Sequence, residues 1–348
     1  LSLGLVLFLL TGISVLLHSM NVLSGTFYVF IYGMLAFTIT QIIVLMKRVN
    51  EVNKRLEYYS KELENKSEQL EIKVIERTEE LEREKQELQK INRMFELKNK
   101  QLEAEMLLAR KIQNRLIPDT PPLANIATMY RPMDLIGGDF FDFIDFHERN
   151  SLGIFLSDVS GHGVPAALIT SMIKGIIHQS GELRKDPAGL LSYMNEHLID
   201  QSAENFVTAF YCIYDLETLE IQYANAGHNA PIIFNSNSAK FVEDADRGTP
   251  LAIINTFDQF KIKKHYINNR LQLSKGDKLL FYTDGLTEAI NPGNKSIDFE
   301  NSGLFPSIKE YSHVSPHRFL QGLYSNLVKF RGGENFDDDI CMIVIEGE

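Results

Sequence analysis

The chain has 348 residues, enough for two or three domains, and carries a formal net charge of −11. This acidic balance leaves no basic face to neutralise phosphates, which argues against nucleic acid as the main partner. The two cysteines, Cys212 and Cys341, each lie in an apolar strand-like run, so we expect buried, reduced thiols and neither a disulfide nor a cysteine metal site.

Two apolar segments, residues 3–17 and 27–46, begin the chain and are nearly free of charge. The second has the roughly 20 residues that a bilayer core requires. A signal peptide would show a basic start and a cleavage site, whereas here a second span follows closely, which favours a transmembrane helical hairpin. Because the first residue is Leu1 and not Met, we expect residues 1–46 to be the end of a longer membrane region.

Four basic residues follow the second apolar segment: Lys47, Arg48, Lys54 and Arg55. The connection between the two segments, residues 18–25, contains no Lys or Arg. The positive-inside rule therefore predicts a multi-pass protein of the cytoplasmic membrane with residues 47–348 in the cytoplasm.

Residues 47–117 predict one long helix, because charge is dense and neither Gly nor Pro occurs before Pro118. Apolar residues recur at heptad spacing, at Leu56, Leu63, Leu70, Val74, Leu81, Leu88, Phe95 and Leu102. This spacing predicts a coiled coil, and a parallel homodimer is favoured because a lone helix of this length would have no tertiary packing. The four-residue step from Leu70 to Val74 is a stutter, where rotation or a register shift could carry a signal inward.

Residues 118–348 are the last predicted domain, which begins where prolines stop the helix. We predict strands at 126–130, 140–146, 152–156, 207–214, 220–224, 230–235, 260–267, 278–282 and 340–345. We predict helices at 164–179, 186–202, 303–311 and 316–329. Strands that follow one another with short turns pair antiparallel, so the pattern predicts an α+β layered domain.

Four aspartates lie at the edges of these strands: Asp139, Asp158, Asp284 and Asp338. Each one alone is an ordinary turn residue or part of a solvated acidic run, and Asp158 could simply open a turn before a helix. If folding gathers all four, they would repel and raise one another's pKa values unless cations lay between them. Oxygen ligands without His or Cys favour magnesium or manganese over zinc.

Six motif blocks occur in order along residues 109–348. They are Ile112-Gln113 with Leu116-Ile117-Pro118, Gly137-Gly138-Asp139-Phe140-Phe141-Asp142, Ser157-Asp158-Val159-Ser160-Gly161-His162-Gly163, Ala226-Gly227-His228-Asn229, Tyr282-Thr283-Asp284-Gly285-Leu286-Thr287-Glu288-Ala289 and Asp338-Asp339-Ile340. Together they resemble the SpoIIE-type bacterial serine phosphatases of the metal-dependent, type 2C-like protein phosphatase superfamily. The resemblance implies a sandwich of two antiparallel β-sheets flanked by helices, with a two-metal site at one end.

The resemblance also implies the roles of individual residues. Asp158 would be shared by two divalent cations, manganese or magnesium, with the backbone carbonyl of Val159 beside it. Asp139 would complete the second metal, and Asp284 and Asp338 the first. Two such cations lower the pKa of a bridging water, and the resulting hydroxide attacks phosphorus in line, so these aspartates would be catalytic through metal-bound water.

The function implied by the resemblance is that of a membrane-anchored, signal-regulated protein serine/threonine phosphatase. The expected partner is a phosphorylated protein, usually an anti-sigma-factor antagonist in this family. The alternative is a catalytically inactive receptor or scaffold that uses the phosphatase-like domain for docking, against which the retained aspartates argue. A metal-dependent nuclease, suggested by carboxylates alone, is disfavoured by the net charge of −11.

Six other residues are left with open roles: Asp142, Asp337, Asp339, His162, His228 and Arg131. The aspartates are candidates to support the ligands from behind. Each histidine could act as an acid or base, or brace a glycine-rich loop. Arg131 could reach the substrate phosphate or be an ordinary surface residue. Cys341 stands where the family usually has Thr after Asp-Asp-Ile, so the positioning of Asp338 could differ.

Overall fold

The structure is a computed structural model that describes residues 2–20, 26–146, 150–243 and 246–348. Residues Leu1–Leu97 and Lys98–Glu348 form two compact units. The predicted connection at 18–25 lies mostly outside the described residues.

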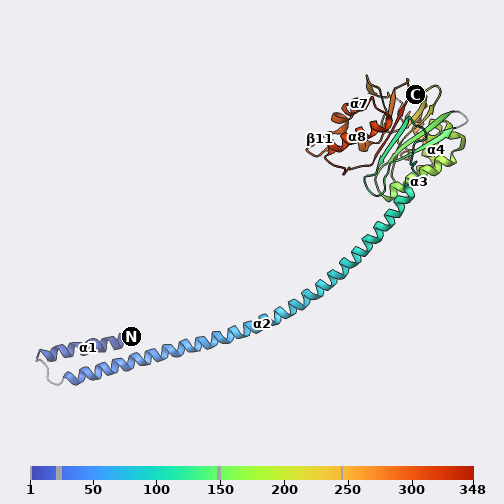
Figure 1. Cartoon of the computed structure of the whole chain (residues 1–348). Helices are drawn as coiled ribbons and strands as arrows, with labels where there is room; N and C mark the ends of the chain where they lie inside the picture. Colours follow the sequence, from blue (N-terminus) through green and yellow to red (C-terminus); the bar gives the residue numbers. More distant parts are fainter. Residues whose placement is uncertain (1, 21–25, 147–149, 244–245) are drawn as a thin grey trace. The chain divides into compact units, whose positions relative to one another are not determined.

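The first unit begins with helix α1 (Ser2–Ser19), and helix α2 runs from Thr26 to Gln113 without a break (Figure 1). The aromatic rings of Phe8 and Phe37 lie 5.4 Å apart, so α1 contacts the first part of α2. Among the described residues, one helix is long and apolar enough to cross a membrane, namely α2 from Tyr32 onward. A shorter apolar stretch, Phe8–Leu17, lies in α1. The predicted long helix is thus present as one continuous element.

The second unit contains two five-stranded antiparallel sheets in its described residues. The first sheet has the order β1 (Ile126–Arg131), β12 (Ile340–Glu346), β9 (Lys278–Tyr282), β6 (Ile232–Phe234) and β7 (Ala239–Phe241). The second has the order β2 (Phe140–Phe146), β3 (Ser151–Val159), β4 (Val207–Asp215), β5 (Glu220–Ala226) and β8 (Asn269–Gln272). A small hairpin joins β10 (Ile290–Asn291) and β11 (Asn294–Asp298).

Helices cover the outer faces of the two sheets (Figure 1). The second sheet packs against α3 (Val164–Gln179) and α4 (Pro187–Leu198), which a 3₁₀ turn (Gly181–Lys185) joins. The first sheet packs against α7 (Phe305–Tyr311) and α8 (Pro316–Arg331), preceded by a π turn (Glu300–Leu304). Two short helices complete the unit: α5 (Thr256–Lys261), and α6 (Asp284–Thr287), which Thr283 alone separates from β9.

The core has three layers because the central strands bury both faces. On β12, Cys341 and Ile343 pack between the sheets, while Met342 packs toward α8. On β3, Ile154 packs between the sheets and Phe155 packs toward α3 and α4. Side chains of a strand alternate between faces, so a strand covered on both sides is apolar throughout. The predicted α+β sandwich with flanking helices is confirmed.

The predicted strand at 260–267 is wrong. Its alternating Phe260 and Ile262 suggested a half-buried strand, but both side chains are exposed. Instead, the side chain of Asn255 accepts a hydrogen bond from Asp258 N and caps α5, and the buried Gln259 donates to Tyr266 Oη at 2.8 Å. The helix cap at Asn255 and the buried amide of Gln259 therefore favour a helix in spite of the alternating apolar residues. The strand of this part of the chain begins later, as β8.

Candidate metal centre

Strand register brings the predicted site residues together in two pairs. Phe140 pairs with Ser157 across β2 and β3, which places Asp139 beside the end of β3 that carries Asp158. In the other sheet, Met342 pairs with Tyr282, which places the residues before β12 beside those after β9. The first pair of aspartates thus comes from one sheet, and Asp284 and Asp338 come from the other.

A hydrogen bond joins the two sheets at this end. Thr283 Oγ1 donates to Asp139 Oδ2 at 2.6 Å and accepts from Cys341 N at 2.9 Å. Both Thr283 and Asp139 are almost completely buried. Because a buried hydroxyl with both partners satisfied has one favoured orientation, Thr283 holds the Asp139 carboxylate toward the first sheet. Cys341, which replaces the usual family Thr, contributes its backbone N–H and not its thiol.

Two glycines allow the backbone of neighbouring segments to approach closely. A Cβ on Gly138 would lie 2.8 Å from the carbonyl oxygen of Val159, so the loop before Asp139 lies directly against the predicted carbonyl ligand. A Cβ on Gly285 would collide with the carbonyl oxygen of Asp339. Any larger residue at either position would force these segments apart.

The four carboxylates are electrostatically coupled. Burial and then the charges of Asp284 and Asp338 raise the pKa of Asp158 to about 7. Burial and then Asp338 raise the pKa of Asp284 to about 6. Burial and then Asp158 raise the pKa of Asp139 far above its usual range, and burial raises that of Asp338. Like charges converge here, which is the environment that a divalent cation would neutralise.

The donor set fits hard cations, although it is not closed into a ready-made cage. Among the described residues, no group of three His, Cys, Asp or Glu side chains is close enough together to hold a metal ion as it is. Magnesium and similar ions keep several waters and use one or two carboxylates each, so a few separated oxygens suffice. Asp139, Asp158, Asp284, Asp338 and the Val159 carbonyl are the groups that would hold them.

Asp339 is a structural clamp that the motif comparison had left as a supporting candidate. Its Oδ1 accepts from Met133 N at 2.7 Å, and its Oδ2 accepts from Gly138 N at 2.5 Å and from Asp139 N at 3.3 Å. The carboxylate therefore fixes the backbone on which Asp139 is carried.

Gln113, the last residue of α2, holds the same loop from the other side. Its Nε2 donates to the Gly137 carbonyl at 2.7 Å, and its Oε1 accepts from Gly137 N at 3.2 Å. The side chain is buried and also lies 3.4 Å from Thr170 Oγ1 on α3. The sequence placed Gln113 in a motif block but gave no signal of this contact, because it joins a side chain to backbone 24 residues away.

Replacing Gln113 with Ala is expected to weaken metal binding by about tenfold or more, since two buried hydrogen bonds, each worth about 1 kcal/mol, are lost and both backbone groups of Gly137 are left unpaired. Manganese titrations followed by thermal unfolding would measure this. Gln101 is the matched control, because it is exposed on α2 and its amide donates to Glu105 on the same helix. Equal manganese affinity in Gln113→Ala and Gln101→Ala would contradict the proposed positioning role.

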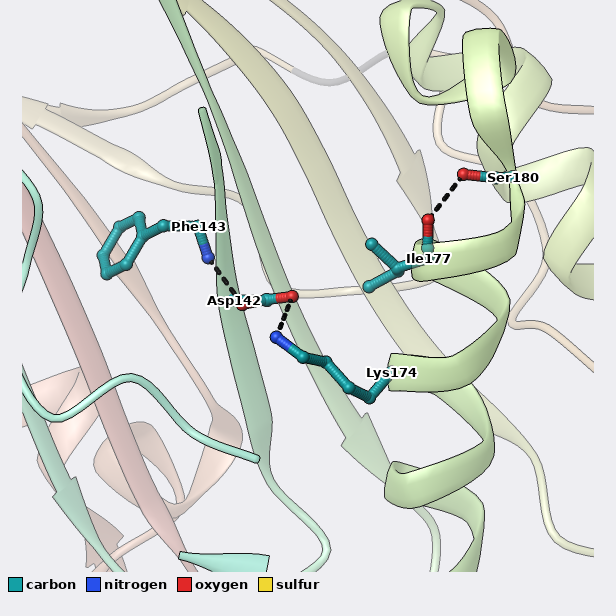
Figure 2. Close-up of polar contacts among 5 residues, drawn as sticks. All are labelled: Asp142, Phe143, Lys174, Ile177 and Ser180. Carbon is teal, nitrogen blue, oxygen red and sulfur yellow. Dashed lines mark hydrogen bonds and ion pairs between the residues drawn. The ribbon is translucent and has the colours of Figure 1, made fainter. Parts of the chain in front are cut away.

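Two of the supporting aspartates are engaged elsewhere. Asp142 on β2 accepts from Lys174 Nζ on α3 at 2.7 Å and from Phe143 N at 3.0 Å, and it ties the sheet to the helix (Figure 2). Asp337 forms an ion pair with Arg331 at 2.5 Å. Neither makes a described hydrogen bond or ion pair with the carboxylate cluster.

The two histidines differ in their surroundings. His228 is buried, and its Nδ1 is hydrogen-bonded to Thr208 Oγ1 at 2.8 Å. Thr208 is the residue of β4 that pairs with Asp158 of β3. Burial and then Arg247 lower the pKa of His228 to about 3, so the imidazole is neutral near pH 7 and braces the strand end. His162 is exposed, and its charge lowers the pKa of Asp338.

Arg131 does not lie against the aspartates through any described contact. Its Nη1 donates to the Tyr130 carbonyl at 3.0 Å, and its guanidinium lies 5.7 Å from the ring centroid of Tyr324 on α8.

Comparison with known proteins supports the same family. The family model described as Stage II sporulation protein E (SpoIIE) matches residues 148–347. Phosphoserine phosphatase RsbU of Bacillus subtilis is 26% identical over 250 residues, which cover 70% of each chain. Phosphoserine phosphatase RsbP of the same organism is 23% identical over 251 residues, covering 70% of this chain and 57% of that protein.

Solved structures show the same fold. The SiaA-PP2C domain of Pseudomonas aeruginosa matches with a TM-score of 0.62 at 19% identity, over 72% of this chain and 98% of that one. The PP2C phosphatase domain and regulatory fragment of SpoIIE from Bacillus subtilis match with a TM-score of 0.51 at 19% identity, over 64% and 63%. The chain therefore belongs to the SpoIIE family, and the resemblance drawn from its six motif blocks is confirmed.

Proposed function

We propose that this chain is a membrane-anchored, signal-regulated protein phosphatase that hydrolyses phosphoserine or phosphothreonine on a partner protein. The observation that carries the proposal is the convergence of Asp139, Asp158, Asp284 and Asp338, whose charges raise one another's pKa values at one end of the sandwich. The names of RsbU and RsbP as phosphoserine phosphatases support the substrate class. By the family resemblance, the partner is a phosphorylated anti-sigma-factor antagonist.

The side chains of the site have distinct tasks in the proposed mechanism. Two divalent cations, manganese or magnesium, would supply an activated water and offset the charge that develops on the phosphoryl oxygens. Asp158, whose pKa is raised by the charges of Asp284 and Asp338 from the other sheet, would hold both cations. Thr283 keeps the Asp139 carboxylate oriented, and Asp339 fixes the backbone beneath it. The partly exposed Asp284 and exposed Asp338 leave the centre open to a bulky phosphoprotein.

The membrane and dimer proposals rest on the first unit. The apolar start of α2, the contact between Phe8 and Phe37, and the basic residues after Met46 support a helical hairpin with residues 47–348 in the cytoplasm. Along α2 the heptad residues are exposed in the single chain, from 48% at Leu102 to 70% at Leu63. A parallel dimer through residues 47–117 would bury this row.

Phosphatase assays on the full chain test the proposal. We expect release of phosphate from a phosphoserine protein with manganese present, no release with a chelator, and strong loss of activity in Asp284→Ala. Activity that persists in the chelator or in Asp284→Ala would overturn the metal-dependent mechanism.

A further inference from the structure

A cavity of about 800 Å³ lies between the last turn of α2, the end of β1 and one face of α8, and none of the four aspartates lines it. Its polar lining includes Arg110, Asn114, Arg131, His317, Gln321 and Tyr324. The proposed phosphatase mechanism uses none of these side chains.

The cavity is basic within an acidic chain. Arg110 comes from α2, Arg131 from β1 and His317 from α8, so three elements each contribute a cationic or protonatable side chain. Asp119 is the only acidic residue that lines this cavity in the described part of the chain, whereas the chain as a whole carries a net charge of −11. A local excess of positive charge on an acidic protein attracts anions.

The lining residues from β1 and α8 contact one another before any ligand binds. His317, Gln321 and Tyr324 lie three and four residues apart and therefore share one face of α8. Gln321 Nε2 lies 3.0 Å from His317 Nε2, and the Arg131 guanidinium lies over the Tyr324 ring. Two guanidinium groups, each with several N–H donors in a planar fork, match the oxygens of phosphate groups.

We propose that this cavity binds a small molecule through its phosphate groups, without using the aspartates of the metal centre. Apolar side chains such as Ile117 and Met129 also line the cavity and suit the non-phosphate part of such a ligand. Because Arg110 and Asn114 flank Gln113 on α2, a ligand here holds the turn that contacts Gly137. The cavity is therefore a site at which a phosphorylated metabolite can act on the positioning of Asp139.

Calorimetric titration of the full chain in chelator tests the proposal without any contribution from metal-bound phosphate. Pyrophosphate and ADP are the two probes, and tighter binding of ADP would assign the ligand to organic phosphates and not to the free anion. Arg131→Ala and Arg110→Ala are expected to weaken binding of both probes about tenfold or more. Arg131→Lys, which keeps the charge but loses the fork, should fall between wild type and Arg131→Ala.

Two neighbouring residues supply matched controls. Lys111 on α2 and Arg318 on α8 are exposed cations next to lining residues but do not line the cavity. Lys111→Ala and Arg318→Ala should bind both probes within about twofold of wild type, since only general charge is lost. Absence of binding to the wild-type chain at millimolar probe, or equal losses in the lining and control variants, would overturn the proposal. Thermal unfolding without ligand verifies that each variant is folded, and the outcome does not depend on phosphatase activity.

Discussion

Asp158→Asn is expected to lower kcat/KM for a phosphoserine protein by about a thousandfold, equivalent to about 4 kcal/mol of transition-state stabilisation. After burial, the charges of Asp284 and Asp338, the pair of aspartates from the other sheet, raise the pKa of Asp158. Asn keeps the shape but removes the charge that would hold two cations, so the loss should appear mainly in kcat. Initial rates at saturating manganese measure it.

Asp200→Asn is the control for this substitution, because Asp200 is exposed in the turn after α4. It should retain full activity. The comparison also decides between the enzyme and the inactive scaffold. If Asp158→Asn loses hydrolysis and signalling together, the phosphatase carries the signal. If wild type and Asp158→Asn are equally inactive and signal equally well, the domain is a docking module.

Much of the fold was predictable where the periodic pattern and the burial agree. The strands at 140–146 and 278–282 and the helix at 164–179 match β2, β9 and α3 residue for residue. Each packs directly against the core, so apolar spacing reports its structure. The prediction failed at 260–267, where Phe260, Ile262 and Ile267 are exposed and their spacing therefore does not report a buried face.

The candidate site was predictable in its charged residues but not in its supports. Asp139 comes directly before one apolar run and Asp158 comes at the end of another, so both lie at strand ends, and antiparallel register then brings them together. The contacts of Gln113, Thr283 and Asp339 depend on which backbone groups meet after folding. Hydrogen bonds between residues far apart in the sequence produce no periodic pattern of residue types. The motif blocks therefore contained these residues without showing their roles.

The metal-free chain is expected to lose stability as pH rises from about 5 to about 7.5. The folded-state pKa values of Asp158 and Asp284 are about 7 and about 6, because of burial first and neighbouring carboxylates second. The unfolded chain has ordinary aspartate values of about 3.9. In this window the folded state binds more protons than the unfolded state, so the free energy of unfolding falls as pH rises.

Thermal unfolding in chelator should therefore show a midpoint lower at pH 7.5 than at pH 5, by on the order of 5 °C. Saturating manganese should remove most of this difference, because bound cations stabilise the ionised carboxylates.

Asp158→Asn removes one of the repelling charges, so at pH 7.5 its metal-free form should unfold at a higher temperature than wild type while Asp200→Asn does not. A metal ligand is expected to be required for hydrolysis although its charge lowers the stability of the metal-free fold. A structural aspartate would stabilise the fold. A metal-free midpoint that rises between pH 5 and pH 7.5, or a destabilised Asp158→Asn, would therefore refute the assignment of these aspartates as metal ligands.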